Sequence, residues 1–422
     1  MLSTSRPILS SGLSVNASAG IQRCFSSSTR TSAEKKRKIV VIGAGFVGSY
    51  VAKALISDSR NTVVLASRNP EKCKLPLEGI YQSLKGLGAQ LLPPAKVDIT
   101  QPSTILPAVE GADAVISLVG ILTGTEKQFI DLQEKGGQYV AQAAKDAGVK
   151  RVVMVSALGI DGGETPYART KLAAEGAFRT LHPDATIVRP SLVFGPGDQF
   201  FARFAKLAKF LPFLPVFGGG KSRFQPVYVG DVAKAVEVVS RDDLEVVNQV
   251  GGKIIEAGGP EVFTYRDLMK ITLNYAGLAS RRLAISLPFW VGYIQGFFLE
   301  KLPESMFTVT RDQVKQLKND NIESDPSDPN RPQDRISIAD LLTRFPPANS
   351  TTSMFSRDAS VNNPRSVLKS VHDILPTYIG EGAQTGPVSG KRMHGRKGAG
   401  TDEMLAEVKR MTEKSGFNKP KQ

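Results

Sequence analysis

Residues 39–48 read IVVIGAGFVG, and this stretch decides the fold. Its four leading apolar residues are typical of a strand that is buried on both faces of a sheet. The glycine-rich turn leads directly into Val47, Val51 and Leu55, which recur at the spacing of a helix with one apolar face. A strand, a GxGxxG turn and a helix in this order predict the first βαβ unit of a dinucleotide-binding fold.

The three glycines of this turn meet different steric needs. We expect Gly43 to make the tight turn, Gly45 to let the backbone approach a pyrophosphate, and Gly48 to let the helix pack closely on the strand. The start of the helix offers unpaired N–H groups and a partial positive charge to the anion. The predicted cofactor contacts are therefore Gly43, Gly45, Phe46, Val47 and Gly48. The alternative is a glycine-rich turn in a fold that has lost its ligand.

The second predicted strand, residues 62–66, ends in Ser67 and Arg68, where NAD-binding proteins usually carry an acid. A carboxylate there accepts from the ribose 2′-hydroxyl, whereas an arginine pairs with a 2′-phosphate. Ser67 and Arg68 are thus predicted to contact the cofactor and to favour NADP(H) over NAD(H), unless Arg68 is simply solvated in a surface loop. Asp98 closes the third predicted strand, where it could accept from the adenine amino group or cap the following helix.

A second constellation joins Ser156, at the end of a later strand, to Tyr167 and Lys171. The tyrosine and the lysine stand four residues apart, on one face of a helix. A free tyrosine has a pKa of about 10 and is a poor base at neutral pH, but a neighbouring ammonium group favours the phenolate. We predict that Tyr167 acts as the acid or base, that Ser156 holds the substrate oxygen, and that Lys171 also binds the nicotinamide ribose. This spacing also arises by chance, so a structural role stays open.

Further strand-like runs alternate with helical stretches along the chain, at 114–119, 151–156 and 185–189. The alternation predicts an α/β fold, a doubly wound parallel Rossmann sheet with helices on both faces. From about residue 196 the pattern loosens into Gly- and Pro-rich loops and further helices. We expect this part to form a smaller C-terminal substrate lobe over the carboxyl edge of the sheet.

Composition divides the chain into five parts. Residues 1–36 are predicted as a mitochondrial transit peptide, and 37–322 as the Rossmann domain with its lobe. Residues 323–365, rich in Asp, Pro, Asn and Ser, are predicted as a flexible insertion with one possible helical turn. Residues 366–382 are expected to form a short terminal element, and 383–422 a basic, mostly disordered tail.

The N-terminal segment is the basis for the predicted location of the protein in the cell. Its first 33 residues hold no Asp or Glu, many Ser and Thr, and the arginines Arg6, Arg23 and Arg30. Such a segment predicts a mitochondrial protein, in the matrix or on the matrix side of the inner membrane. The alternative is a disordered N-terminus with a chance bias. No apolar run reaches the 18 or so residues that a membrane-spanning helix needs.

The net charge of +14 lies mainly at the two ends of the chain. Residues 1–38 carry seven Lys and Arg against one acid, and 383–422 carry nine against four. The middle of the chain is therefore nearly balanced, and no nucleic-acid partner is expected. Two distant cysteines and three scattered histidines show no metal-ligand spacing, so no metal site is expected.

Residues 287–299 hold the only tryptophan and a row of aromatic residues at helical spacing, which are Phe289, Trp290, Tyr293, Phe297 and Phe298. Apolar surface left in water costs about 25 cal/mol per Å², so this face must be covered. We expect it to pack on its own lobe. The alternative is peripheral contact with the inner membrane or with a membrane subunit.

The glycine loop, Asp98, Ser156 and the pair Tyr167 and Lys171, in this order, resemble the short-chain dehydrogenase/reductase superfamily in its extended or atypical branch. The resemblance covers about residues 38–322. Three stretches narrow it to the family of the Rossmann-type accessory subunit of mitochondrial complex I and its bacterial relatives: SALG at 156–159, RFQPVY at 223–228 and TRDQV at 310–314.

This resemblance implies a subunit that holds NADPH tightly and takes no part in electron transfer. It predicts an accessory subunit or assembly factor of complex I (NADH:ubiquinone oxidoreductase), with the cofactor mainly structural and complex I subunits as partners. Ser156, Tyr167 and Lys171 equally allow an active NAD(P)-dependent reductase, epimerase or dehydratase. A third alternative is a factor in ubiquinone biosynthesis, with quinone-biosynthesis proteins as partners. The sequence leaves open whether the chain is an enzyme.

Overall fold

The computed structural model describes residues 36–69, 90–292, 311–348 and 364–380. Its centre is an eight-stranded sheet whose neighbouring strands are all parallel, in the order β14-β11-β6-β5-β4-β1-β2-β3. The strands are β1 (Arg37–Ile42), β2 (Asn61–Ser67), β3 (Ala95–Lys96), β4 (Ala114–Ser117), β5 (Arg151–Val155), β6 (Thr186–Pro190), β11 (Ile254–Ala257) and β14 (Arg335–Ser337).

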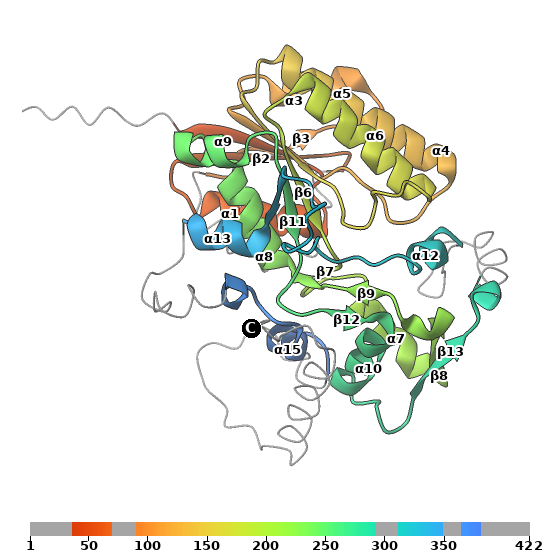
Figure 1. The fold of residues 1–422 in the computed structure, drawn as a ribbon. Helices are drawn as coiled ribbons and strands as arrows, with labels where there is room; N and C mark the ends of the chain where they lie inside the picture. Colours follow the sequence, from red (N-terminus) through yellow and green to blue (C-terminus); the bar gives the residue numbers. More distant parts are fainter. Residues whose placement is uncertain (1–35, 70–89, 293–310, 349–363, 381–422) are drawn as a thin grey trace, which may run out of the picture.

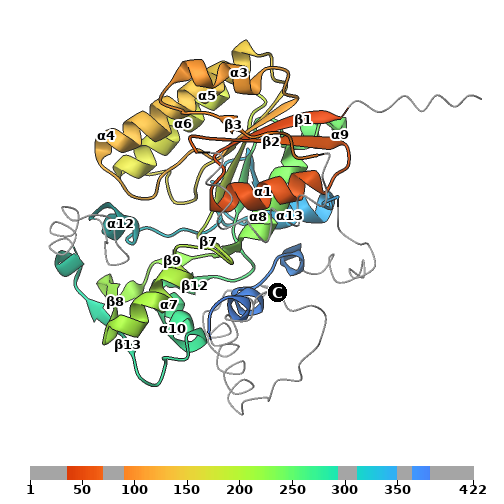
Figure 2. The ribbon, with the colours of Figure 1, turned by 180° about the vertical axis from the view of Figure 1, so that it is seen from behind.

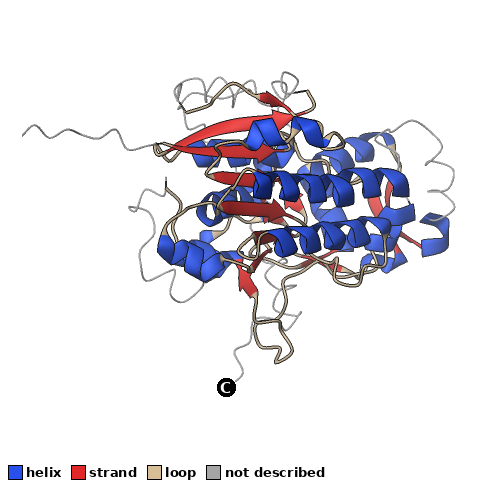
Figure 3. Ribbon diagram, turned by 90° about the horizontal axis from the view of Figure 1, so that it is seen from above, coloured by secondary structure: helices blue, strands red, loops and turns tan. Residues whose placement is uncertain are grey.

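Helices cover both faces of this sheet (Figure 1), and those of one face lie side by side when the molecule is seen from above (Figure 3). Strand β1 alternates between two cores, because Ile39 and Val41 pack on one side and Val40 and Ile42 on the other. One side is covered by α1 (Phe46–Ile56), α8 (Val229–Val239) and α13 (Ile338–Arg344), and the other by α3 (Leu106–Val109), α5 (Gly136–Asp146) and α6 (Pro166–Leu181). The predicted doubly wound parallel sheet is confirmed.

The strand order reverses at β1. From β1 the chain runs outward through β2 and β3, then crosses to β4 and continues through β5, β6, β11 and β14 on the other side. The chain segments that follow β1 and β4 therefore run in opposite directions. This divergence opens a crevice beyond the carboxyl ends of the two strands. This crevice is where an open α/β sheet binds its ligands.

A smaller lobe lies at the carboxyl edge of the sheet (Figures 1 and 2). Its own core buries Phe194, Phe201, Leu214, Leu268 and Val371. The lobe contains α7 (Phe201–Phe210), β8 (Phe213–Phe217), α10 (Tyr265–Tyr275), β13 (Leu283–Leu287) and α15 (Val371–Ile374), with the short strands β7 (Val193–Phe194), β9 (Arg223–Phe224), β10 (Val227–Tyr228) and β12 (Phe263–Thr264).

The remaining described elements are short. They are α4 (Glu126–Phe129), α9 (Leu244–Val250), α12 (Arg311–Gln316), the 3-10 turns η2 (Pro102–Thr104), η4 (Gly218–Gly220), η5 (Pro364–Val367) and η6 (Leu375–Thr377), and a π-helical stretch, Ile130–Lys135, that joins α4 to α5.

The flexibility predicted for 323–365 is wrong where the segment forms β14 and α13, whereas the possible helical turn predicted within it is present as α13. Arg335–Ser337 pair with β11 as the edge strand of the main sheet, and α13 buries Leu341 and Leu342 against the same core. The strand is three residues long and holds one apolar residue, so it shows no periodicity that a sequence pattern could detect. Residues 349–363 lie outside the described residues.

Other predictions also fall on residues that the structure does not describe. These are the leader up to residue 35, the tail at 383–422, and Tyr293, Phe297 and Phe298 of the aromatic row. Across the four described ranges, no helix is long and apolar enough to span a membrane. Within the same ranges, no group of three or more His, Cys, Asp or Glu side chains could hold a metal ion.

Candidate functional site

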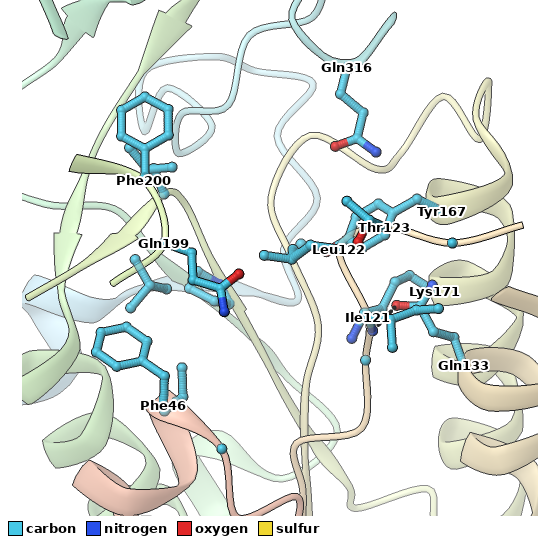
Figure 4. A pocket seen from close by; sticks show the side chains of 18 of the residues that line it. Phe46, Ile121, Leu122, Thr123, Gln133, Tyr167, Lys171, Gln199, Phe200 and Gln316 are labelled. Atoms are coloured by element: carbon cyan, nitrogen blue, oxygen red, sulfur yellow. Dashed lines mark hydrogen bonds between the residues drawn. The ribbon is translucent and has the colours of Figure 1, made fainter. Parts of the chain in front are cut away.

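A cleft of about 2620 Å³ lies between the carboxyl edge of the sheet and the lobe. Loops after β1, β2, β4 and β5 form one wall, and α7 with its flanking residues forms the other. Figure 4 shows Tyr167, Lys171 and Gln133 on one side of this space, opposite Phe46 and Phe200. The cleft therefore sits at the switch point of the sheet, where a Rossmann fold binds a dinucleotide.

The glycine loop has the geometry that a pyrophosphate needs. Gly43 has φ +108°, and a Cβ on Gly48 would lie 2.2 Å from the carbonyl oxygen of Gly43. A Cβ on Gly45 would meet nothing within 4 Å, so at Gly45 the backbone borders open space. The loop residues Phe46 and Val47 line the cleft with the three glycines. The close approach of Gly48 to the Gly43 carbonyl is thus permitted only by the missing side chain.

The N-terminus of α1 also has the features of an anion-binding site. Its N-cap is Gly45, no side chain in the described ranges caps its first amides, and its first turn holds no acidic residue. Uncapped N–H groups at the end of an eleven-residue helix attract an anion through hydrogen bonds and the helix dipole. These residues fit the pyrophosphate of a dinucleotide.

Ser67 and Arg68 line the cleft at the end of β2, and Arg68 is exposed. Asp98 does not line the cleft, although its neighbours Val97 and Ile99 do. Its Oδ1 accepts from the backbone N–H and the hydroxyl of Thr100, at 3.0 and 2.7 Å. These hydrogen bonds, with a smaller effect of the Arg68 charge, hold the pKa of Asp98 below its usual value. In this structure Asp98 stabilises the turn that follows β3, which ends at Lys96.

Ser156, Tyr167 and Lys171 line the same cleft. Ser156 follows β5 directly, and within the part of the chain that the structure describes its buried Oγ has no hydrogen-bond partner. The other two lie on α6, which Pro166 and the capping side chain of Thr165 start at the right place. The three residues are therefore brought together, as the sequence predicts, by the end of one strand and the first turns of the next helix.

Lys171 is the buried charge of the site. Its Nζ donates to the carbonyl oxygens of Val119 and Val155, at 2.9 and 3.3 Å. Burial lowers its pKa to about 8, while the charge of Glu175 acts in the opposite direction. The side chain is thus mostly protonated at neutral pH, and it is held by the loop that follows β4 and by the last residue of β5. A protonated ammonium four residues from Tyr167 lowers the cost of forming a phenolate.

Two side chains that the sequence analysis did not single out hold α6 in place. Arg189 on β6 forms a bidentate pair with Glu175 at 2.9 and 2.7 Å, and both residues are buried. Gln133, in the π-helical stretch, donates to Thr170 and accepts from the backbone of Ile121. Glu175 lies one turn beyond Lys171 on the same helix. That spacing is the only sequence pattern that could have indicated a partner for α6 in this group of residues.

A third overlooked residue comes from a distant part of the chain. The side-chain amide of Asn321 donates to the carbonyl oxygen of Leu158 at 2.7 Å, and its backbone oxygen accepts from Ser191. The neighbouring Asp320 pairs with Arg223 at 2.7 Å. Residues 319–321 therefore border the cleft beside the loop after β5.

The aromatic row at 287–299 is described only at its start. The Nζ of Lys318 lies 5.3 Å from the centroid of the Phe289 ring, whereas Trp290 is 63% exposed. On the neighbouring strand β13, Leu283 and Ile285 are also exposed. How the complete aromatic face is covered stays a prediction.

Comparison with known proteins agrees with this geometry. The family described as NAD dependent epimerase/dehydratase family matches residues 39–251, half of the chain. The chain therefore belongs to the NAD dependent epimerase/dehydratase family.

Within that family, the chain is similar to mitochondrial proteins that are named as subunits of NADH dehydrogenase. The protein named NADH dehydrogenase [ubiquinone] 1 alpha subcomplex subunit 9, mitochondrial, from Arabidopsis thaliana is 32% identical over 68% of this chain and 70% of its own length. The protein of the same name from Rattus norvegicus is 30% identical over 66% and 70%. A ceramide reductase of Caulobacter vibrioides is 26% identical over 59% and 74%. The resemblance predicted from the sequence is thus confirmed.

Proposed function

We propose that the chain is a mitochondrial accessory subunit of respiratory complex I that binds NADP(H), with the dinucleotide serving mainly to stabilise the fold. The observation that carries the proposal is the uncapped N-terminus of α1 behind the glycine loop, in a chain whose relatives are named as complex I subunits. The partners are then other complex I subunits, on the matrix side of the inner membrane.

Arg68 supports NADP(H) over NAD(H). It stands at the end of β2, it lines the cleft, and its charge lies close enough to Asp98 to lower the pKa of that carboxyl. An arginine at this place offers two parallel N–H donors to a 2′-phosphate. Ser67, one residue earlier, borders the same part of the cleft.

The places of the predicted cofactor contacts support a stabilising role. These contacts come from the loop before α1, from the end of β2 and from Lys171 on α6, and the helices α1 and α6 cover different faces of the sheet. A ligand that binds only the folded chain stabilises it by about 2.7 kcal/mol when present at 100 times its Kd. Thermal unfolding of the purified chain with NADPH or with NADH tests this role, and NADPH is expected to raise the Tm more.

One observation favours a second function, that of an active NAD(P)-dependent reductase, epimerase or dehydratase. The Oγ of Ser156 is buried, has no hydrogen-bond partner among the described residues and belongs to a residue that lines the same cleft as Tyr167. A bound dinucleotide would supply or accept the hydride. Ser156 would then hold the substrate oxygen, Tyr167 would exchange a proton with it, and the Lys171 charge would ease that exchange.

Deletion of the gene, with NADH:ubiquinone reductase activity and ubiquinone content followed together, separates these functions. The accessory-subunit proposal expects loss of complex I activity and its rescue by the Tyr167→Phe variant. Rescue by wild type but not by Tyr167→Phe would instead support catalysis. Normal complex I with low ubiquinone would contradict the subunit proposal and favour a role in quinone biosynthesis.

A further inference from the structure

The lobe side of the cleft is apolar and aromatic, in contrast to the side that carries the glycine loop. We call this part the lobe compartment, and its walls are Phe200, Phe204, Leu207, Leu211, Tyr265 and Leu317. A pocket for one small molecule has roughly 300–1,000 Å³. The whole cleft, at about 2620 Å³, has room for a second ligand beside a dinucleotide.

The aromatic wall is packed edge to face. The Phe200 ring lies 5.1 Å from Phe204 and 6.3 Å from Tyr265, with interplanar angles of 69° and 70°. Tyr265 is buried, and that burial raises the pKa of its hydroxyl. Phe200 and Phe204 are only partly buried, so part of each ring faces the cleft. Such mutual contacts hold the rings in fixed positions and give a preformed apolar surface.

The opposite wall adds an apolar side chain of its own. Leu122, in the loop after β4, is 63% exposed and lines the cleft. In Figure 4 it projects into the space between the two walls, toward Gln199 and Phe200. Binding is favoured when a ligand covers the apolar surface of this leucine and removes it from water. The hydroxyl groups of a sugar would find few hydrogen-bond partners among these Phe and Leu side chains.

The charge of the lobe wall is positive. Helix α7 reads FARFAKLAKF without an acid, and its Arg203 and Lys206 line the cleft. Among the described residues, two carboxylates beside this wall have partners of their own, because Asp198 accepts from three backbone N–H groups and Asp320 pairs with Arg223. An anionic group is therefore favoured beside this wall.

We propose that the lobe compartment binds the hydrocarbon tail of an anionic amphiphile, with the anionic group near Arg203 and Lys206. The tail is a straight acyl chain or a prenyl chain, both of which the apolar walls accommodate. This site lies beyond the dinucleotide contacts and does not depend on which dinucleotide binds. It provides a second ligand for the cleft whether or not Tyr167 catalyses a reaction.

Calorimetric titration of the purified full-length chain, with and without saturating NADPH, tests the proposal. The probes are octanoate, decanoate and dodecanoate below their micelle concentrations. Affinity is expected to rise about fourfold for each added methylene, since each buried CH₂ contributes about 0.8 kcal/mol. Decyltrimethylammonium, with the opposite charge, is expected to bind at least tenfold more weakly than decanoate.

Two variants on one helix locate the site. Phe204→Ser is expected to weaken dodecanoate binding at least tenfold, whereas Phe210→Ser leaves it unchanged, because Phe210 is 69% exposed and does not line the cleft. Decanoate and geranate have ten carbons and one carboxylate each, so the tighter of the two identifies the tail as acyl or prenyl.

Affinity that does not change with chain length, or that the cation matches, would overturn the proposal even if the Phe204 variant failed to fold. Equal loss in both phenylalanine variants would also overturn it. A titration with NADPH alone tests the dinucleotide site, and its result does not depend on whether the fatty acids bind.

Discussion

The two walls of the cleft are built from different chemistry. The sheet wall presents backbone N–H groups, Ser156 and the buried Lys171, positioned by strand ends and by the buried pair of Arg189 and Glu175. The lobe wall presents partly buried aromatic rings and two cations on α7. The polar side chains of the predicted site, Ser156 and Lys171, thus come from the sheet and α6, whereas the lobe contributes an apolar surface with two cations.

Removing a charge from the sheet wall should lower the free energy of unfolding far more than removing one from the lobe wall. The largest effect is expected at Glu175. The Glu175→Gln variant leaves the buried Arg189 without its bidentate partner and should lower the free energy of unfolding by about 3 kcal/mol. Urea unfolding measures this. The exposed pair of Arg169 and Glu126 provides the control, since Glu126→Gln should cost less than about 1 kcal/mol.

On the lobe wall the corresponding change is apolar. Phe204→Leu keeps an apolar side chain at a partly buried position and should cost only about 1 kcal/mol. A loss at Phe204 as large as that at Glu175 would contradict the contrast between the walls.

The pH dependence of stability isolates Lys171. Its pKa is about 8 in the folded chain, against 10.5 for a free side chain, because it is buried. Between these values the unfolded chain binds more protons, so the free energy of unfolding should rise with pH, by an amount on the order of 3 kcal/mol. Below about pH 8 this group gives no slope.

The comparison is between the wild type and Lys171→Met, from which this rise should be missing. Lys206→Met, which removes an exposed lysine of the lobe wall, should retain it. Parallel curves for the wild type and Lys171→Met would show that the lysine is not buried as described.

Within the sheet wall, two glycines should separate folding from binding. Gly48→Ala places a Cβ 2.2 Å from a backbone oxygen and should destabilise the fold by about 2 kcal/mol. Gly45→Ala meets no atom within 4 Å and should leave the unfolding curve unchanged while weakening dinucleotide binding. Unfolding curves and NADPH titrations of both variants check this. Unchanged NADPH binding in Gly45→Ala would show that the pyrophosphate does not bind beside Gly45.

At Arg68 the expected effect is on nucleotide binding. Arg68→Gln should weaken NADPH about tenfold through loss of charge-assisted hydrogen bonds and leave NADH unchanged. Fluorescence titration with both nucleotides measures the ratio. If both affinities fall together, Arg68 does not contact a 2′-phosphate.

The sheet wall could be predicted from sequence because short segments determine it. The strand, glycine turn and helix at 39–56 lie within one contiguous stretch, and Tyr167 and Lys171 share one helix. Asp98 was placed only approximately, because β3 ends two residues earlier than predicted and the carboxylate bonds to its own turn.

The lobe wall could not be predicted in the same way. Its aromatic surface forms when Phe200 and Phe204 meet Tyr265, which lies on a separate helix. Asn321 and the edge strand β14 reach the sheet through long-range hydrogen bonds that have no local pattern. The buried pair of Arg189 and Glu175 likewise joins a strand to a helix earlier in the chain.

The most direct test of the central claim is to identify the nucleotide released when the native protein, purified from its own mitochondria, is denatured. The proposed function predicts about one NADP(H) per chain, and little or none from the Gly45→Val variant. Protein that is folded and intact but releases no dinucleotide would contradict it.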